Sequence, residues 1–177
     1  AWQESITAGR FAGKTVIVTG AGSGIGLATA LRVAKEGGKV IAADISPERL
    51  DALVAGNSSL DVAAVAGDIS DEDTIAAIVA AAGGRVDALA NVAGIMDHFA
   101  PVHEVDDATW DRVFRINVTA LMRLTRAVVP LMLEVGSCMV GSPASSTRTG
   151  TLVPTRRSSA LAGSGIGLTR NSSVMYG

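Results

Sequence analysis

Four short, largely apolar runs recur along the first half of the chain. They are KTVIVT at 14–19, KVIAAD at 39–44, DVAAVA at 61–66 and VDALAN at 86–91. Continuous apolar runs of this length are typical of strands that are buried on both faces of a sheet. The pattern therefore predicts four strands of a parallel sheet.

Helical patterns separate these runs. One helix is expected from the glycine-rich turn at 20–26 to about Glu36, and a second is expected to begin after the N-cap Ser46 and Pro47. Further helices are predicted over 71–82, around Trp110 after a cap at Asp106 or Asp107, and over about 117–134, which Pro130 should kink or loosen. Alternating strands and helices predict an α/β fold, a doubly wound parallel sheet in three α/β/α layers, as a single domain over 1–177.

Composition narrows the classes of function. The chain has 177 residues, 48% of them hydrophobic, which is enough for one domain with a substantial core. Its net charge of −2 argues against a nucleic-acid partner and against a polybasic membrane binder. The single cysteine, Cys138, and two histidines, His98 and His103, form no zinc-ligand pattern, so we expect no metal.

Targeting signals are not expected either. No apolar run reaches the roughly 18 residues that a membrane span needs, and residues 1–10 lack the basic and apolar regions of a signal peptide. A cytoplasmic protein without a membrane partner is the expectation.

The strongest motif is TGAGSGIG, residues 19–26, which follows a predicted strand and opens a predicted helix. Gly20 permits a sharp turn, Gly24 lets the backbone approach a pyrophosphate, and Gly26 lets the helix pack closely. Free N–H groups at the helix N-terminus would hold the anion. The turn therefore predicts a dinucleotide site that includes Ser23 and Ile25.

Carboxylates at strand ends extend this predicted site. Asp44, with Ile45 after it, ends the second strand eighteen residues after Gly26. A carboxylate there accepts both ribose hydroxyls and repels a 2′-phosphate, which favours NAD over NADP. Asp68 and Ile69 follow the third strand, where the aspartate is placed to hold the adenine amino group.

The fourth strand ends in NVAG, residues 91–94. Small residues there, Ala93 and Gly94, let the backbone pass close to a dinucleotide. Asn91 is able to hydrogen-bond to neighbouring strands.

Together these segments resemble the classical short-chain dehydrogenase/reductase family. TGAGSGIG is similar to the family's TGxxxGxG, and NVAG is similar to NNAG. The segments RINV at 115–118 and GLTRNSSVMYG at 167–177 resemble those around the family's catalytic asparagine and after its active site.

The resemblance implies a single-domain, Rossmann-type oxidoreductase that passes a hydride between NAD(P) and a small alcohol or carbonyl substrate. It implies a homo-tetramer or dimer, with the apolar helix over 117–134 in the interface, although burial of that helix against the sheet accounts for much of its apolar character as well. It places the catalytic asparagine at Asn117 and the substrate-positioning serine at Ser145. The family's tyrosine and lysine positions fall on Ser158 and Ala162, neither of which is able to do that work.

Two departures leave alternatives open. Residues 136–163 contain arginines but no acidic residue and no lysine, and the chain stops before the family's last strands. The protein is a defective relative, a fragment of an ordinary enzyme with an aberrant segment, or the product of a coding sequence read out of frame there. The favoured function is an NAD-dependent oxidoreductase, and the alternative is a dinucleotide-binding module without turnover.

Overall fold

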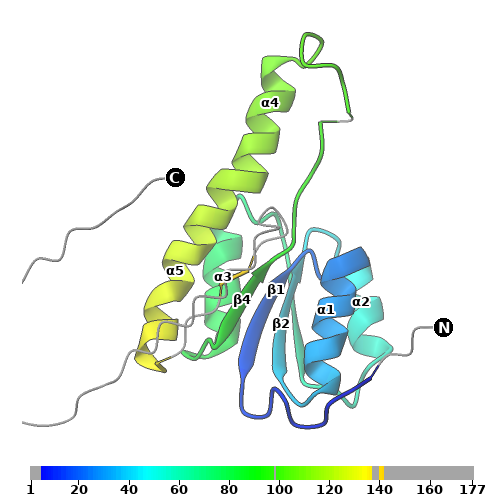
Figure 1. The fold of residues 1–177 in the computed structure, drawn as a ribbon, viewed down its shortest axis with the longest axis vertical. Coiled ribbons are helices and arrows are strands. Elements are labelled where there is room, and N and C mark those ends of the chain that lie inside the picture. Colours follow the sequence, from blue (N-terminus) through cyan, green and yellow to red (C-terminus); the bar gives the residue numbers. More distant parts are fainter. Residues whose placement is uncertain (1–4, 98, 137–139, 142–177) are drawn as a thin grey trace, which may run out of the picture.

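A computed structural model of the chain describes residues 5–97, 99–136 and 140–141. The described strands form one parallel sheet in the order β3-β2-β1-β4-β5 (Figure 1). The strands are β1 (Thr15–Thr19), β2 (Lys39–Asp44), β3 (Val62–Ala66), β4 (Ala88–Asn91) and β5 (Val140–Gly141). The four strands predicted from the apolar runs are confirmed, with bounds within two residues of the expected ones.

Helices cover both faces of the sheet, as Figure 1 shows, which confirms the doubly wound α/β fold. The helices α1 (Gly24–Lys35) and α2 (Pro47–Ala55) lie on one face. The other face carries α3 (Glu72–Ala82) and α5 (Leu121–Glu134).

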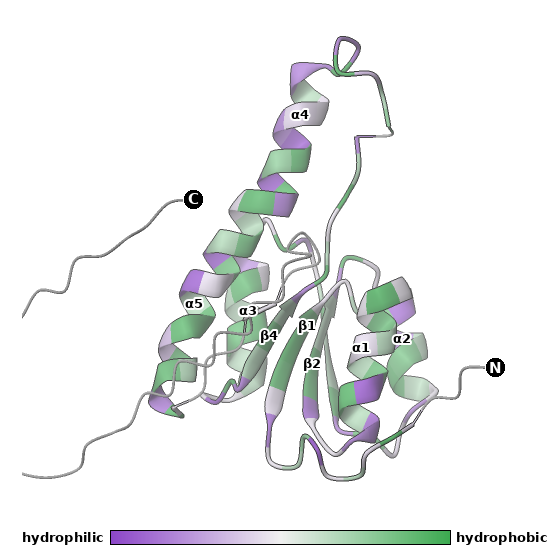
Figure 2. Cartoon of the chain, viewed as in Figure 1, coloured by the Kyte–Doolittle hydropathy of each residue, from purple (hydrophilic) through white to green (hydrophobic). Residues whose placement is uncertain are grey.

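Alternate strand residues supply two separate cores. Val16 and Val18 of β1 belong to the cluster under α1 and α2, whereas Ile17 between them belongs to the cluster with Ile78 and Leu124 under α3 and α5. Figure 2 shows the apolar strands of the sheet lying between the helices. Burial on both faces explains why the strands read as continuous apolar runs.

Capping residues begin and end the helices where the sequence predicts. The Ser46 hydroxyl accepts a hydrogen bond from the Arg49 N–H at 3.3 Å at the start of α2. Gly83 ends α3 in the left-handed conformation, at φ 69°. Asp106, rather than Asp107, caps α4 (Asp107–Phe114), and its carboxylate accepts from the Thr109 N–H at 2.6 Å.

The helix around Trp110 and the helix expected from residue 117 are one continuous helix, Asp107–Glu134. A π-helical segment, Arg115–Ala120, joins α4 to α5. The two are continuous because residues 107–129 contain neither glycine nor proline. The helix also continues through Pro130, which therefore does not end it.

By length and composition alone, Asp107–Glu134 is the one helix in the described parts of the chain that meets the criterion for a membrane span. Charged residues interrupt its apolar positions, which is why no unbroken apolar run marks it in the sequence. Leu124, Val128 and Met132 of α5 are buried in the core, whereas only 22% of the most apolar stretch of the helix is buried.

Two buried carboxylates tie the chain together at the end of the sheet where the strands begin. Asp87 accepts hydrogen bonds from the Thr15 N–H at 2.9 Å, from Lys14 Nζ at 3.0 Å and from Arg85 Nε at 2.9 Å. Burial alone would raise the pKa of Asp87, but the hydrogen bonds from these three groups outweigh it and lower the pKa to about 2. Glu36 binds the Thr7 N–H at 2.8 Å, which contributes most to lowering the pKa of that carboxyl.

Candidate functional site

The glycine-rich turn adopts the conformation that its sequence requires. Gly20 and Gly24 lie in the left-handed region, at φ 67° and 52°. A Cβ on Gly20 would lie 2.9 Å from the Ala93 nitrogen, and a Cβ on Gly26 would collide with the Gly20 carbonyl oxygen. Nothing described lies within 4 Å of a Cβ placed on Gly24, so the chain leaves open space there. The turn therefore has no room for a side chain at Gly20 or Gly26, whereas the space beside Gly24 is open.

Thr19 joins this turn to the end of β4. Its side chain is buried, and the hydroxyl accepts hydrogen bonds from the Val92 N–H at 3.0 Å and the Ala93 N–H at 3.1 Å. These bonds set the NVAG backbone against Gly20. The end of β4 therefore lies beside the start of α1, at the point where the strand order reverses between β1 and β4. Ligands bind in such a crevice in open parallel sheets.

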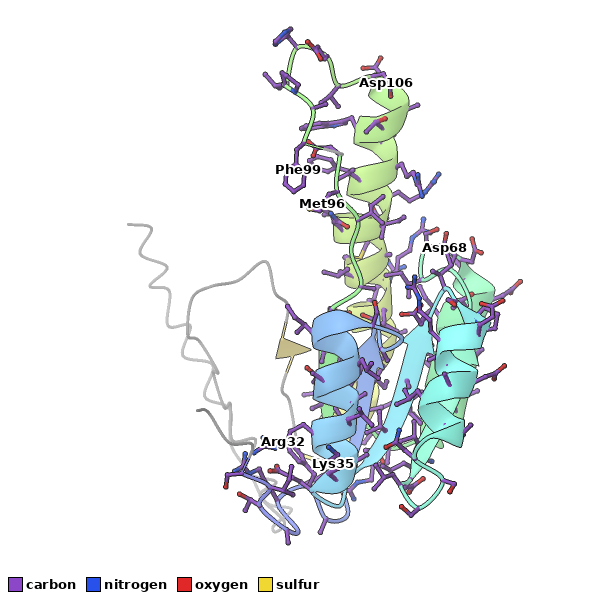
Figure 3. All side chains as sticks on the ribbon, turned by 90° about the vertical axis from the view of Figure 1, so that its right-hand side faces the viewer. Arg32, Lys35, Asp68, Met96, Phe99 and Asp106 are labelled. Atoms are coloured by element: carbon purple, nitrogen blue, oxygen red, sulfur yellow. The ribbon has the colours of Figure 1, made fainter. Side chains whose placement is uncertain are left out.

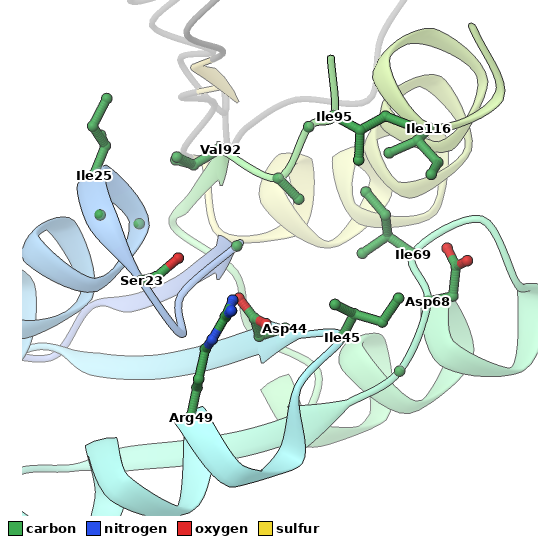
Figure 4. Close-up of a pocket in the computed structure, with 16 residues that line it drawn as sticks. Ser23, Ile25, Asp44, Ile45, Arg49, Asp68, Ile69, Val92, Ile95 and Ile116 are labelled. Atoms are coloured by element: carbon green, nitrogen blue, oxygen red, sulfur yellow. The ribbon is translucent and has the colours of Figure 1, made fainter. Parts of the chain in front are cut away.

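A cavity of about 480 Å³ opens at this point, along the carboxyl ends of the strands. Figure 4 shows its lining residues. The structure brings together eleven of the predicted cofactor residues there: Gly20, Ser23, Gly24, Ile25, Gly26, Asp44, Ile45, Asp68, Ile69, Ala93 and Gly94. The glycine turn and the ends of the strands line this cavity.

Asp44 is held as a hydrogen-bond acceptor at the end of β2. It is only 6% exposed. Its Oδ2 accepts from the Gly22 N–H at 2.8 Å, and its Oδ1 accepts from the Ser46 N–H at 3.0 Å. Each carboxylate oxygen has two lone pairs, so each keeps acceptor capacity toward the cavity. The geometry suits a carboxylate that receives a pair of hydroxyl groups.

Asp68 lies at the rim of the cavity after β3. Its Oδ1 accepts from the Ser70 N–H at 2.8 Å, which fixes the carboxylate in a local turn. Ile69 beside it is buried and joins the core under α3. Asp68 therefore places a carboxylate, and Ile69 an apolar side chain, at the same end of the cavity.

Asn91 is placed differently from the other predicted cofactor residues. It is 2% exposed and does not belong to the cavity lining, whereas its neighbour Val92 does. Its Nδ2 donates to the Thr125 hydroxyl at 3.3 Å and so joins β4 to α5.

Asn117 lies in the π-helical segment, and both polar ends of its side chain are engaged. Its Oδ1 accepts from the Ile95 N–H at 2.9 Å, and its Nδ2 donates to the Ile95 carbonyl at 2.8 Å. A Cβ on Gly94 would lie 3.2 Å from the same Oδ1. The side chain thus holds the backbone that follows β4, which makes Asn117 a positioning residue for the cavity wall. Ser145, Ser158 and Ala162 lie outside the described residues.

Sequence reasoning missed five lining residues, namely Arg49, Gly67, Val92, Ile95 and Ile116. Ile116 comes from the π-helical segment and Arg49 from the first turn of α2, so their positions depend on how distant elements pack. Gly67 directly precedes Asp68 at the end of β3. Its position next to the predicted pair Asp68 and Ile69 could have indicated from the sequence that it lines the cavity.

The segment after β4 projects beyond the cavity along α4. Figure 3 shows Met96 and Phe99 on this segment, with Asp106 at its far end where α4 begins. Arg32 and Lys35 lie at the opposite end of the molecule, in the last turn of α1. His103 is exposed, 3.5 Å from Glu104, and His98 lies outside the described residues. Within the described residues no group of three or more histidine, cysteine or acidic side chains is placed to hold a metal ion.

Comparisons with known proteins agree with this geometry. A family model for short chain dehydrogenases matches residues 14–149. A short-chain dehydrogenase/reductase of Penicillium canescens is 42% identical over 123 residues, which are 67% of this chain and 46% of the relative. The chain spans about half the length of the curated relatives it matches.

Solved structures show the same architecture. The 3-ketoacyl-(acyl-carrier-protein) reductase from Brucella melitensis, complexed with NADH, aligns with a TM-score of 0.70 at 34% identity, over 74% of this chain and 57% of that one. A metagenomic short-chain oxidoreductase in complex with NADP aligns with a TM-score of 0.69 at 31% identity, over 75% of this chain and 62% of that one.

Proposed function

Because the chain belongs to the short-chain dehydrogenase family, we propose that the whole protein is an oxidoreductase. It passes a hydride between a nicotinamide dinucleotide and a small alcohol or carbonyl substrate. The cavity at the strand ends supports this proposal, because a glycine turn, a helix N-terminus and the Asp44 carboxylate converge there. This combination supplies separate sites for a pyrophosphate and a ribose.

Each part of the cavity has a distinct task toward the cofactor. The N–H groups at the start of α1 are donors for the pyrophosphate, and the open space at Gly24 admits it. Asp44 accepts the hydroxyls of the adenosine ribose, and Asp68 accepts the adenine amino group. Val92, Ile95 and Ile116 form an apolar wall that excludes water, and Asn117 holds Ile95 in that wall. The bound nicotinamide supplies or accepts the hydride.

The preferred cofactor in this proposal is NAD. A carboxylate at position 44 repels a 2′-phosphate, and position 23 carries serine rather than a basic residue. Solved relatives are complexed with either NADH or NADP, which supports the cofactor class rather than the preference.

The proposal includes self-association. Val118, Met122 and Leu133 are about half exposed on the long helix, and an apolar hollow beside β4 is lined by α5 residues that include Leu121 and Pro130. We place a second copy of the chain on this face, as a homo-dimer or homo-tetramer, rather than a membrane. The net charge of −2 offers no electrostatic basis for a nucleic-acid partner, and a cytoplasmic location belongs to the same proposal.

The test has two stages. NADH is titrated into the full chain and its fluorescence is followed, and then NAD with a panel of secondary alcohols is assayed for NADH formation. Saturable binding followed by turnover is the expected result. Binding without turnover would replace the oxidoreductase by a dinucleotide-binding module, and absence of binding would remove both.

Peptide mass spectrometry over residues 135–170 accompanies the assay. A tyrosine and a lysine four residues apart in those peptides would supply the acid/base pair that hydride transfer needs. Peptides that match Ser158 and Ala162 would instead favour the module without turnover.

A further inference from the structure

The helix α4 exposes two aromatic rings. None of its residues is buried. Trp110 and Phe114 lie one turn apart, with their ring centroids 4.5 Å from each other, and they are 52% and 43% exposed. A helix with an apolar stripe normally buries it against a partner. The aromatic side of α4 is therefore an uncovered surface in the described parts of the chain.

The segment that leads to α4 extends this surface. Met96, Phe99 and Val102 are 62%, 79% and 83% exposed. Figure 1 shows this segment and α4 standing clear of the sheet, and Figure 3 shows Met96 and Phe99 on the segment. We call residues 96–97 and 99–114 the arm. Large apolar side chains that gather on an exposed element mark a surface for an interaction partner.

The charge of the arm limits the chemistry of that partner. Residues 96–107 contain neither lysine nor arginine, and they contain four acidic residues, Asp97, Glu104, Asp106 and Asp107. Within the ranges that the structure describes, no lysine or arginine forms an ion pair with these four carboxylates. A surface with this charge attracts a cationic partner, and its apolar side chains favour a partner that also carries apolar groups.

Residues 142–177 of the same chain have this chemistry. They contain four arginines, at positions 148, 156, 157 and 170, and no aspartate, glutamate or lysine. Apolar residues such as Val153 and Leu161 stand close in sequence to the arginine pair at 156 and 157. The four positive charges match the four carboxylates of the arm, which favours this stretch over a neutral or acidic occupant.

The path of the chain places this stretch within reach of the arm. β5 pairs with β4 in parallel, with Gly141 opposite Ala90. The chain after Gly141 therefore leaves the sheet at the same edge as the chain after β4, which continues into the arm. Fifteen residues lead from Gly141 to Arg156, and extended chain of that length spans roughly 50 Å. That reach exceeds the roughly 20 Å of helix from Asp107 to Ala120.

We propose that the arm is the docking surface for the basic stretch 142–177 of the same chain. The arginines of this stretch pair with the arm carboxylates, and its apolar side chains cover Trp110 and Phe114. The interaction is separate from the dinucleotide cavity, so the proposal stands or falls independently of the proposed function.

A nitroxide label on residue 159 tests the proposal in the full chain. Ser159→Cys carries the label in a Cys138→Ser background, because Cys138 is the only cysteine of the sequence. The label should broaden the amide signals of Val102 and Trp110 at low salt. The broadening should be lost near 1 M salt, where the screening length falls to about 3 Å.

Neutral variants of the arm show whether its carboxylates make the contact. Glu104→Gln, Asp106→Asn and Asp107→Asn, combined in the labelled chain, should reduce the broadening at Trp110 severalfold. Asparagine at position 106 keeps the N-cap of α4, so the helix itself should stay intact.

The matched control removes three acidic side chains at the start of another helix. Asp71→Asn, Glu72→Gln and Asp73→Asn, combined at the exposed start of α3, should leave the broadening at Trp110 unchanged. An equal loss in this control would mean that the net charge of the chain, rather than the arm, attracts the basic stretch, and would overturn the proposal.

A mixed sample separates contacts within one chain from contacts between chains. Isotope-labelled chain without the nitroxide is mixed with unlabelled chain that carries it, and the Trp110 signal should stay sharp. Broadening in the mixture as strong as in the single labelled chain would assign the surface to a second copy instead. Sharp Val102 and Trp110 signals in the labelled chain itself, or broadening that survives the three arm substitutions, would also overturn the proposal.

Discussion

At single residues, the shape of the cavity depends on glycines that have no room for a side chain and on two buried polar side chains that bind neighbouring backbone. A Cβ on Gly26 would collide with the carbonyl oxygen of Gly20, so only glycine fits at position 26 in this turn. Thr19 and Asp44 are buried polar residues, and each satisfies backbone N–H groups of a neighbouring loop. These contacts hold the glycine turn against the ends of β2 and β4.

The substitution Gly26→Ala should lower both the stability of the chain and its affinity for a dinucleotide. The added methyl group collides with backbone, which is unable to move without opening the turn, so we expect a loss of about 1–3 kcal/mol in stability. Dinucleotide binding should fall below detection. Gly56→Ala is the control, because position 56 has an ordinary helical φ of −72°. NADH titration and denaturant unfolding measure both effects, and undiminished binding by Gly26→Ala would contradict the role of the turn.

The carboxylate of Asp87 should make the stability of the chain depend on pH in acid. Its folded pKa of about 2 lies below the value of about 3.9 for an unfolded aspartate. A lowered folded pKa contributes stability above the unfolded value, and that contribution is lost as pH falls from about 4 toward 2. Asp87→Asn should therefore cost about 2 kcal/mol near neutral pH and flatten the acid limb of the stability curve. Urea unfolding over a pH series measures it.

Asp111→Asn, an exposed substitution on α4, is the control for that series. The unfolding free energy of Asp111→Asn should fall with decreasing pH as steeply as that of the parent chain. An Asp87→Asn curve as steep as the parent's would show that other carboxylates cause the acid sensitivity.

At the scale of elements, strand and helix positions follow from local patterns, whereas the joins between them do not. KVIAAD predicts β2 with its bounds because burial on both faces leaves a continuous apolar run. The continuity of α4 with α5 through the π-helical segment was missed, although residues 107–129 contain neither glycine nor proline to end a helix. The lining residues Arg49 and Ile116 were missed for a related reason, since only the packing of α2 and the long helix brings them to the cavity.

The π-helical segment also carries an element-scale prediction. Asn117→Ala removes both hydrogen bonds to Ile95 and leaves that backbone unpaired. The protection of the Ile95 amide from hydrogen exchange should fall by roughly tenfold or more. Asn57→Ala, which removes a bond to the Leu53 carbonyl in α2, should leave Ile95 unchanged. Equal protection of Ile95 in both variants would show that Asn117 does not hold the cavity wall.

At the scale of the whole molecule, the long helix presents apolar side chains that the sheet does not cover. Met122 is 49% exposed on this helix. If a second copy covers it, Met122→Glu buries an unpaired charge and should weaken self-association by at least about a hundredfold. Light scattering after size exclusion measures the change. Ala52→Glu, on the exposed face of α2, is the control, and equal masses for the parent and Met122→Glu would place the interface elsewhere.

We propose that the cavity between the glycine turn and the end of β4 holds a nicotinamide dinucleotide. Amide chemical-shift mapping of the isotope-labelled chain during NADH titration tests it most directly. The amides of Ser23, Gly24 and Ile95 should move together and saturate with one dissociation constant, while that of Asp87, at the other end of the sheet, should stay. Shifts centred on the Asp87 end of the sheet, or none at all, would contradict the claim.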